Sequence, residues 1–220
     1  MATPRRILQL SHDYEGPFRG ICRQYVCAFP DAHVTTLFIC GDRSEAVARE
    51  VGATRSRFLE RPHRAMRGLK LATLRQLHPV FRDGNFDLVI AQRYRPVYFA
   101  GILSLVNEIP LIVGVTHEPG VYHSRARRRV IRYGKNIVLA GVSDFVSDDI
   151  ERDLPGLRAS ERLYTLPNAI DPSRADDMMT PQAARQALGL PDDRFVFGTV
   201  GRLIDKMPPR PDRWLRSLCQ

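Results

Sequence analysis

Two groups of residues in this 220-residue sequence have types and spacings suited to binding an anion. Arg202 follows an apolar run and Lys206 lies four residues later, so a guanidinium and an ammonium could contact the same phosphate groups, with solvated surface charges as the alternative. The loop Gly16-Pro17-Phe18-Arg19-Gly20 follows another apolar run, and glycine permits close approach of a ligand to the backbone. Arg19 is a candidate anion contact in this loop, and a plain structural turn is the alternative reading.

A third candidate is His117, which follows the near-continuous apolar run of residues 110–116 and precedes Glu118. A neutral imidazole can hydrogen-bond a ligand hydroxyl or position reacting groups, and a structural role is the alternative for a lone histidine. We group Glu118 with it as a candidate contact to the same ligand. Ser143 could also contact a ligand, although capping the helix that follows is an equally good explanation.

Several other signatures are missing from the sequence. No G-x-S-x-G motif is present, which argues against a Ser-His-Asp hydrolase, and no G-x-G-x-x-G follows the first strand, which weakens an NAD-dependent enzyme. The four cysteines form no C-x-x-C pair and have no histidine at zinc-ligand spacing, so we expect free thiols and no metal. No run approaches the ~18 apolar residues of a membrane span, and we recognise no signal peptide. We therefore expect a soluble, cytoplasmic protein.

The elements that must position these residues alternate between strands and helices. This order predicts an α/β, Rossmann-like parallel sheet with helices on both faces, because parallel strands need crossover connections. We expect strands at residues 6–11, 33–40, 86–91, 110–117 and 137–143, and helices at 21–29, 44–51, 64–81, 97–106, 124–133 and 144–154. Ligands bind at the carboxyl ends of such strands, which would gather residues 13–20, 92–95 and 117–120 at one edge.

The pattern changes after this region. We expect a first domain at residues 1–167, a linker with a helix (181–188) at 168–193, and the first strand of a second domain within 194–206. Residues 207–220 form a Pro- and Arg-rich tail, and its three prolines between positions 208 and 211 do not suit the helix expected after Lys206. Our hypothesis is that the tail results from a frameshift or a truncated gene model.

The positive charge is concentrated in two segments. The chain carries 33 Lys and Arg against 24 Asp and Glu, a formal net charge of +9, while residues 55–82 alone have a net charge of +7 and residues 125–135 of +6. Such segments suit anionic partners. A solvated basic face is the alternative, and nucleic acid fits poorly because no nucleic-acid-binding motif is present.

Four motifs in this order resemble the N-terminal half of retaining glycosyltransferases of family 4, which have the GT-B fold. The motifs are Ala140-Gly141-Val142-Ser143 with residues 144–149, Leu166-Pro167-Asn168-Ala169-Ile170-Asp171, residues 185–191, and residues 198–206. The resemblance spans residues 5–206 and is most specific from Ala140 onward.

This resemblance implies transfer of a sugar, with retention, from a nucleotide-sugar to an acceptor of the lipopolysaccharide or polysaccharide type, without a cofactor. It implies that Arg202, Lys206, Gly16 and Gly20 contact the donor diphosphate and that His117 faces the transferred sugar. Glu118 and Arg19 are then candidate contacts to the acceptor or to an anion. The first loop departs from the adjacent glycines common in the family, which makes the roles of Gly16 and Gly20 less secure.

The resemblance also implies a second domain with the nucleotide pocket, so we expect little or no transfer by these 220 residues alone. The alternatives are a non-catalytic Rossmann-like fragment that binds an anionic glycan or lipid, and a relative of the GT-B sugar-nucleotide epimerases. The basic segments 55–82 and 125–135 would suit peripheral binding to an anionic membrane, at the inner face of the cytoplasmic membrane, near a glycan or lipid-linked acceptor.

Overall fold

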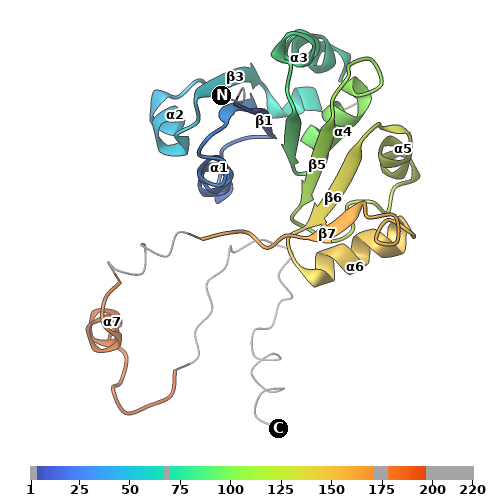
Figure 1. Cartoon of the computed structure of the whole chain (residues 1–220). Helices are drawn as coiled ribbons and strands as arrows, with labels where there is room; N and C mark the ends of the chain where they lie inside the picture. Colours follow the sequence, from blue (N-terminus) through green and yellow to red (C-terminus); the bar gives the residue numbers. More distant parts are fainter. Residues whose placement is uncertain (1–3, 67–69, 171–177, 197–220) are drawn as a thin grey trace. The chain divides into compact units, whose positions relative to one another are not determined.

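The computed structural model describes residues 4–66, 70–170 and 178–196. The chain divides into two compact units, residues 1–171 and 172–220, which are described here one at a time. The first unit is built around a seven-stranded sheet (Figure 1). Its strands are β1 (Arg6–Ser11), β2 (His33–Cys40), β3 (Arg55–Arg61), β4 (Leu88–Gln92), β5 (Leu111–Thr116), β6 (Ile137–Gly141) and β7 (Leu163–Thr165).

All neighbouring strands are parallel, in the order β3-β2-β1-β4-β5-β6-β7. The chain starts in the middle of the sheet, builds outward to β3, and then crosses back to β4 beside β1. The order therefore reverses between β1 and β4, and crevices at such a reversal are where ligands bind in open α/β sheets. The predicted Rossmann-like parallel sheet is confirmed.

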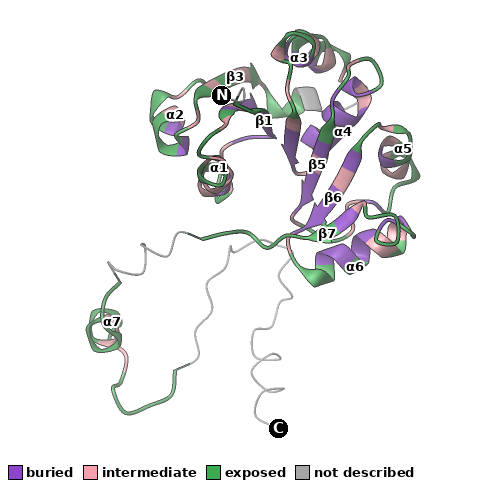
Figure 2. Ribbon diagram, in the orientation of Figure 1, coloured by how far each residue is buried: buried purple, intermediate pink, exposed green. Residues whose placement is uncertain are grey.

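Helices cover both faces of the sheet, as predicted. They are α1 (Phe18–Cys27), α2 (Glu45–Val51), the 3₁₀ turn η1 (His63–Met66), α3 (Leu71–Gly84), α4 (Tyr94–Leu103), α5 (Arg125–Tyr133) and α6 (Asp144–Asp153). Helices α3 to α6 contribute to the largest cluster of buried apolar side chains, and α1 and α2 pack in two smaller clusters. Figure 2 shows this burial along the central strands. No helix among the described residues has the length and apolar character needed to cross a bilayer.

The central strands read as apolar runs because both of their faces are covered. In β5, Ile112 and Val115 are fully buried on opposite faces of the sheet. Gly114 lies between them, and a Cβ there would come within 2.9 Å of Leu139 and Val97. The glycine therefore lets α4 pack closely against β5 and β6.

Two serines cap helices, and one of them is Ser143, for which the sequence offered this role. Ser44 accepts a hydrogen bond from the backbone N–H of Val47 at the start of α2, and Ser143 accepts one from Val146 at the start of α6, each at 3.3 Å. Each serine satisfies one of the donors that a helix start leaves open.

The helix predicted over residues 64–81 is wrong in its first part. The described residues there form η1 and then α3, which begins only at Leu71 because Lys70 adopts a left-handed backbone conformation with φ of 55°. The preceding segment is β3, which the sequence did not suggest. As an edge strand it pairs only with β2 and carries exposed arginines, so it lacks an apolar pattern.

The second unit contains α7 (Pro181–Leu188), which matches the predicted helix. The Thr180 side chain accepts a hydrogen bond from the backbone of Ala183, and Gly189 ends the helix with a φ of 64°. Residues 194–196 of the predicted strand are not in a strand, and its remainder, like residues 207–220, lies outside the described residues. The domain boundaries expected at residues 167, 193 and 206 stay predictions.

Candidate functional site

The residues that follow β1, β4 and β5 meet at the carboxyl edge of the sheet, beside the reversal in strand order. They enclose a pocket of about 290 Å³, whose lining also includes a residue of α5. The lining residues are His12, Arg93, Tyr94, Arg95, Thr116, His117, Glu118, Val121 and Arg127. A larger hollow of about 370 Å³ beside α2 and β3 lacks histidines and is lined partly by the ion pair of Arg43 with Glu45. Imidazoles, guanidiniums and a carboxylate converge in the smaller pocket, so we take it as the candidate site.

His117 lies in this pocket, at the end of β5, as the sequence predicted. Its Nε2 lies 2.9 Å from Oε1 of the buried Gln92, and its ring packs edge-on against Phe18. Burial and, to a smaller extent, the nearby Arg93 guanidinium lower its pKa to about 4, while Glu118 acts in the opposite direction. His117 is therefore neutral near pH 7, with its proton on Nε2 and a lone pair on Nδ1.

His12 is a second neutral imidazole, at the end of β1, and is only 3% exposed. Burial lowers its pKa to about 4; Asp13 opposes this shift, and Arg95 and Arg93 reinforce it. Arg95 donates from Nη1 to Nε2 of His12 at 2.9 Å, so the ring proton is on Nδ1. The 3.6 Å approach of His12 to Asp13 is accordingly a contact with a neutral ring and not an ion pair near pH 7.

Three arginines complete the pocket. Arg93 contacts the buried Asp13 at 3.4 Å and lies over the Phe18 ring, 4.8 Å from its centroid. Arg127 lies over Tyr94 at 4.6 Å and donates to the carbonyl of Val121 at 2.9 Å. Cation–π contacts and carbonyl bonds of this kind orient a guanidinium without neutralising its charge.

Arg93 also has an unusual backbone. Its φ of 73° and ψ of 164° lie in a region that is almost restricted to glycine. It stands directly between β4 and α4, and its N–H donates to the carbonyl of Val115 in β5 at 2.9 Å. The strand thereby turns into the helix without a glycine, beside the pocket.

The other predicted site residues lie in different places. Glu118 lines the pocket, whereas Arg19 in α1 forms an ion pair with Glu50 at 3.1 Å and is not among the lining residues. Gly16 has a left-handed φ of 57°, and Gly20 lies within α1. Their proposed ligand contacts stay predictions. Arg202 and Lys206 lie outside the described residues.

Residues 92–95 were predicted at this edge as a segment, although neither Arg93 nor Arg95 was singled out as a site residue, and His12 and Arg127 were not predicted there. His12, Arg93 and Arg95 each follow a predicted strand at its carboxyl end, and that position is the signal that could have identified them. Arg127 lies on a helix eleven residues after the end of β5, so only the folded chain shows that it reaches the pocket.

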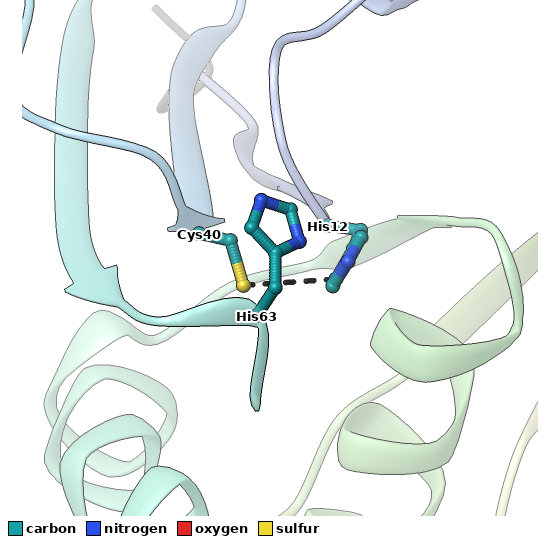
Figure 3. Close-up of side chains that lie close together, drawn as sticks. All are labelled: His12, Cys40 and His63. Carbon is teal, nitrogen blue, oxygen red and sulfur yellow. Dashed lines mark hydrogen bonds between the residues drawn. The ribbon is translucent and has the colours of Figure 1, made fainter. Parts of the chain in front are cut away.

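Some side chains near the site could hold a metal ion. Atoms of His12, Cys40 and His63 lie within 4.8 Å of one another, and Figure 3 shows Cys40 and His63 beside His12. The Cys40 sulfur lies 4.0 Å from Nδ1 of His12. These are zinc-type donors. One feature opposes a divalent cation at these atoms, namely the Arg95 guanidinium bonded to the same imidazole.

The class of protein follows from this fold and a family comparison. Residues 22–174 match the model of the family described as Glycosyltransferase Family 4. The chain therefore belongs to this glycosyltransferase family, and its first unit has the fold of the N-terminal domain of GT-B glycosyltransferases. No curated protein matches the sequence.

Solved structures support the fold at low sequence identity. A lipopolysaccharide outer core galactosyltransferase, WaaB, in its apo form, matches with 12% identity and a TM-score of 0.57 over 75% of this chain and 46% of its own. A glycosyltransferase from Rickettsia africae ESF-5 matches with 11% identity and a TM-score of 0.57 over 87% of this chain and 51% of its own. A UDP-N-acetylglucosamine 2-epimerase matches with 9% identity and a TM-score of 0.54 over 74% and 46%. The chain thus spans about half the length of these proteins.

Proposed function

We propose that this chain supplies the acceptor-binding half of a glycosyltransferase that moves a sugar from a nucleotide-sugar to a glycan or lipid-linked acceptor. The observation that carries the proposal is the pocket with a neutral, oriented His117 at the carboxyl edge of the sheet, in a chain of Glycosyltransferase Family 4. The further details, namely retention and an acceptor of the lipopolysaccharide or polysaccharide type, rest on the motif resemblance alone.

His117 suits the positioning of a sugar hydroxyl. Because the protonated Nε2 donates a hydrogen bond to Oε1 of Gln92, Nδ1 has a lone pair that can accept a hydrogen bond from a hydroxyl group. A pKa of about 4 keeps that lone pair available at neutral pH. Glu118 follows His117 and lines the same pocket, so its carboxylate can also accept hydrogen bonds from sugar hydroxyls.

The donor side of the proposal concerns different residues. Arg202 and Lys206 would stabilise the charge that develops on the leaving nucleoside diphosphate, as the resemblance implies. Gly16 and Gly20 would contact the donor phosphates, as the resemblance implies, and Arg19 would add an anion contact if it exchanged Glu50 for a ligand.

Peripheral binding to an anionic membrane is part of the same proposal. Helix α5, within the basic segment 125–135, carries the exposed Arg125, Arg129 and Arg132, and the neighbouring Tyr133 is 72% exposed. Arginines beside an exposed aromatic ring suit the headgroup region of a bilayer. Exposed arginines of β3, in the segment 55–82, would add to the attraction. Co-sedimentation with anionic and neutral liposomes tests this part, and equal absence of binding to both would contradict it.

Acceptor binding can be tested on the 220-residue chain itself. A ¹⁵N-labelled chain is titrated with oligosaccharides from lipopolysaccharide cores, and His117→Gln is compared with His33→Gln, which alters an exposed histidine at the start of β2. We expect binding that weakens about threefold to tenfold in His117→Gln, since one neutral hydrogen bond is lost. His33→Gln should bind like the unsubstituted chain. Absence of binding to any oligosaccharide, or an unaffected His117→Gln variant, would contradict the proposal.

The reaction is tested separately with radiolabelled nucleotide-sugars. Transfer to an acceptor with the donor's anomeric configuration would support a retaining glycosyltransferase. Little or no transfer is expected from these 220 residues alone, so oligosaccharide binding without transfer agrees both with half of a glycosyltransferase and with the non-catalytic alternative. Conversion of a nucleotide-sugar to its epimer without acceptor would instead favour the epimerase alternative, to whose fold the 2-epimerase similarity points.

A further inference from the structure

Three guanidinium groups converge on the candidate pocket from two elements that are distant in sequence. Arg93 and Arg95 come from the turn between β4 and α4, and Arg127 comes from α5. The lining contains one carboxylate, Glu118, and its two imidazoles are neutral near pH 7. The lining therefore carries a net positive charge.

Contacts within the protein hold these guanidiniums in place. Arg95 is bonded to the neutral His12, and Arg127 to a backbone carbonyl and the face of Tyr94, and neither contact neutralises a guanidinium. Arg93 forms an ion pair with the buried Asp13 at 3.4 Å, which offsets its charge. Three guanidiniums against the carboxylates of Asp13 and Glu118 still leave a net positive charge, and Arg95 and Arg127 are oriented to bind an anion.

The pKa values of neighbouring groups are consistent with the positive charge of the pocket. Lys70, which lies over Tyr98 at 4.6 Å, has its pKa lowered by burial and then by the guanidiniums of Arg95 and Arg127. Arg93 acts in the same direction on His117. Cationic forms are thus disfavoured here, as expected where positive charges are close together.

We propose that this pocket binds a phosphate or carboxylate group carried by the acceptor, so that the enzyme takes an anionic glycan or lipid and not a neutral sugar. That the acceptor carries this group rests on the function proposed above, whereas the binding of an anionic group rests on the pocket alone. A planar guanidinium matches either group through paired N–H donors. His117 and Glu118 then lie near the sugar hydroxyls next to the charged group.

Matched pairs of small ligands test this proposal by calorimetry on the 220-residue chain. Glucose 6-phosphate and glucuronate are each compared with glucose, at low and high salt. We expect both charged ligands to bind at least about tenfold more tightly than glucose, with an advantage that shrinks as salt is added. Binding of glucose as tight as that of both charged ligands would overturn the proposal.

Two variants place the binding in the pocket. Arg127→Gln removes a lining guanidinium, and Arg49→Gln removes an exposed arginine of α2 that lies outside both basic segments and is not among the lining residues. We expect glucose 6-phosphate to bind about 10- to 100-fold more weakly to Arg127→Gln, as for loss of a hydrogen bond between charged groups, and normally to Arg49→Gln. Equal losses would mean that the anion responds to the overall charge of the chain and would overturn the assignment. The melting temperatures of both variants show whether each is folded.

Further arms identify the source of the anionic group. Binding of phosphatidylglycerol vesicles but not phosphatidylcholine vesicles, weakened by Arg127→Gln more than by Arg129→Gln, would support a lipid headgroup. Binding of the soluble anions alone would support a charged glycan. UDP or GDP that displaces glucose 6-phosphate and binds more tightly would make the pocket a donor-phosphate site and overturn the acceptor assignment.

Failure of this inference can be told apart from failure of the proposed function. Neutral core oligosaccharides that bind through His117 with no preference for anions would leave the proposed function intact and remove the inference. Anion binding that depends on Arg127, in a chain that binds no oligosaccharide, would support the anion site and contradict the proposed function.

Discussion

The backbone conformation of Arg93 leads to an unusual prediction. At this position the variant with glycine should be more stable toward unfolding than the variant with alanine. The φ of 73° and ψ of 164° of Arg93 are costly for any residue with a Cβ, by about 1–3 kcal/mol. The hydrogen bond from its N–H to Val115 and the contacts of its guanidinium with Asp13 and Phe18 hold this conformation.

Two substitutions separate the strain from the side chain. Arg93→Ala loses the guanidinium contacts and keeps the strain, whereas Arg93→Gly loses the same contacts and the strain together. Glycine costs about 0.5–1 kcal/mol in extra chain entropy, so we expect Arg93→Gly to exceed Arg93→Ala in unfolding free energy by about 1 kcal/mol. In a unit of this size that corresponds to a melting temperature about 2–4 °C higher.

Urea unfolding followed by circular dichroism measures the difference. Arg129→Gly and Arg129→Ala provide the control, because Arg129 lies in the ordinary helix α5, where glycine should be less stable than alanine by about 1 kcal/mol. The order of stability should therefore reverse between the two positions. An Arg93→Ala variant as stable as Arg93→Gly would refute the claim that this turn is strained. Both Arg93 variants should bind glucose 6-phosphate more weakly, since both lack the guanidinium.

Three further results are expected. A Cβ at Gly141 would lie 2.7 Å from the backbone nitrogen of Ser147, so Gly141→Ala should lower the unfolding free energy by about 1–3 kcal/mol. Urea unfolding measures this change, and an unchanged unfolding free energy would show that α6 can move away. Gly20 lies in α1 with open space around it, so Gly20→Ala should raise stability by about 0.5–1 kcal/mol, and a simultaneous loss of nucleotide-sugar binding would support its proposed donor contact. His12 and His117 have pKa values lowered to about 4, so in the folded state they stay neutral while the unfolded chain takes up protons below pH 6.5. Their contribution to stability is therefore complete above pH 6.5 and declines as the pH falls toward 4, by up to about 1.4 kcal/mol per unit for each histidine, and a His117→Gln variant with the same pH dependence of melting would contradict this.

Much of the fold could be predicted because its signals are local. The apolar runs of β5 and β6 and the capping serine before α6 each identify an element within a dozen residues. The strand β3 could not be found in this way, since its pairing with β2 is made through the backbone and its side chains are largely polar. The break at Lys70 was missed for a related reason, because a left-handed φ at a lysine leaves no trace in composition.

The residues of the candidate site also differ in whether a local sequence signal identifies them. His117 was found because it directly follows an apolar strand, and the parallel order of the sheet then fixes where that strand end lies. Arg127 was missed because its place in the pocket depends on how α5 folds back toward α4. The anionic preference inferred here needs Arg127 together with Arg93 and Arg95, so it depends on tertiary structure that local patterns do not encode.

One short turn, residues 92–95, organises the whole pocket. Gln92 orients His117, Tyr94 supports the guanidinium of Arg127, and Arg95 fixes the tautomer of His12. These three side chains and that of Arg93 can act at the same place because the backbone turns sharply at Arg93, at the point where the strand order reverses. A glycine there would relax the turn but remove a cation from the pocket. A strained arginine is therefore expected where the charge matters more for ligand binding than the lost stability does.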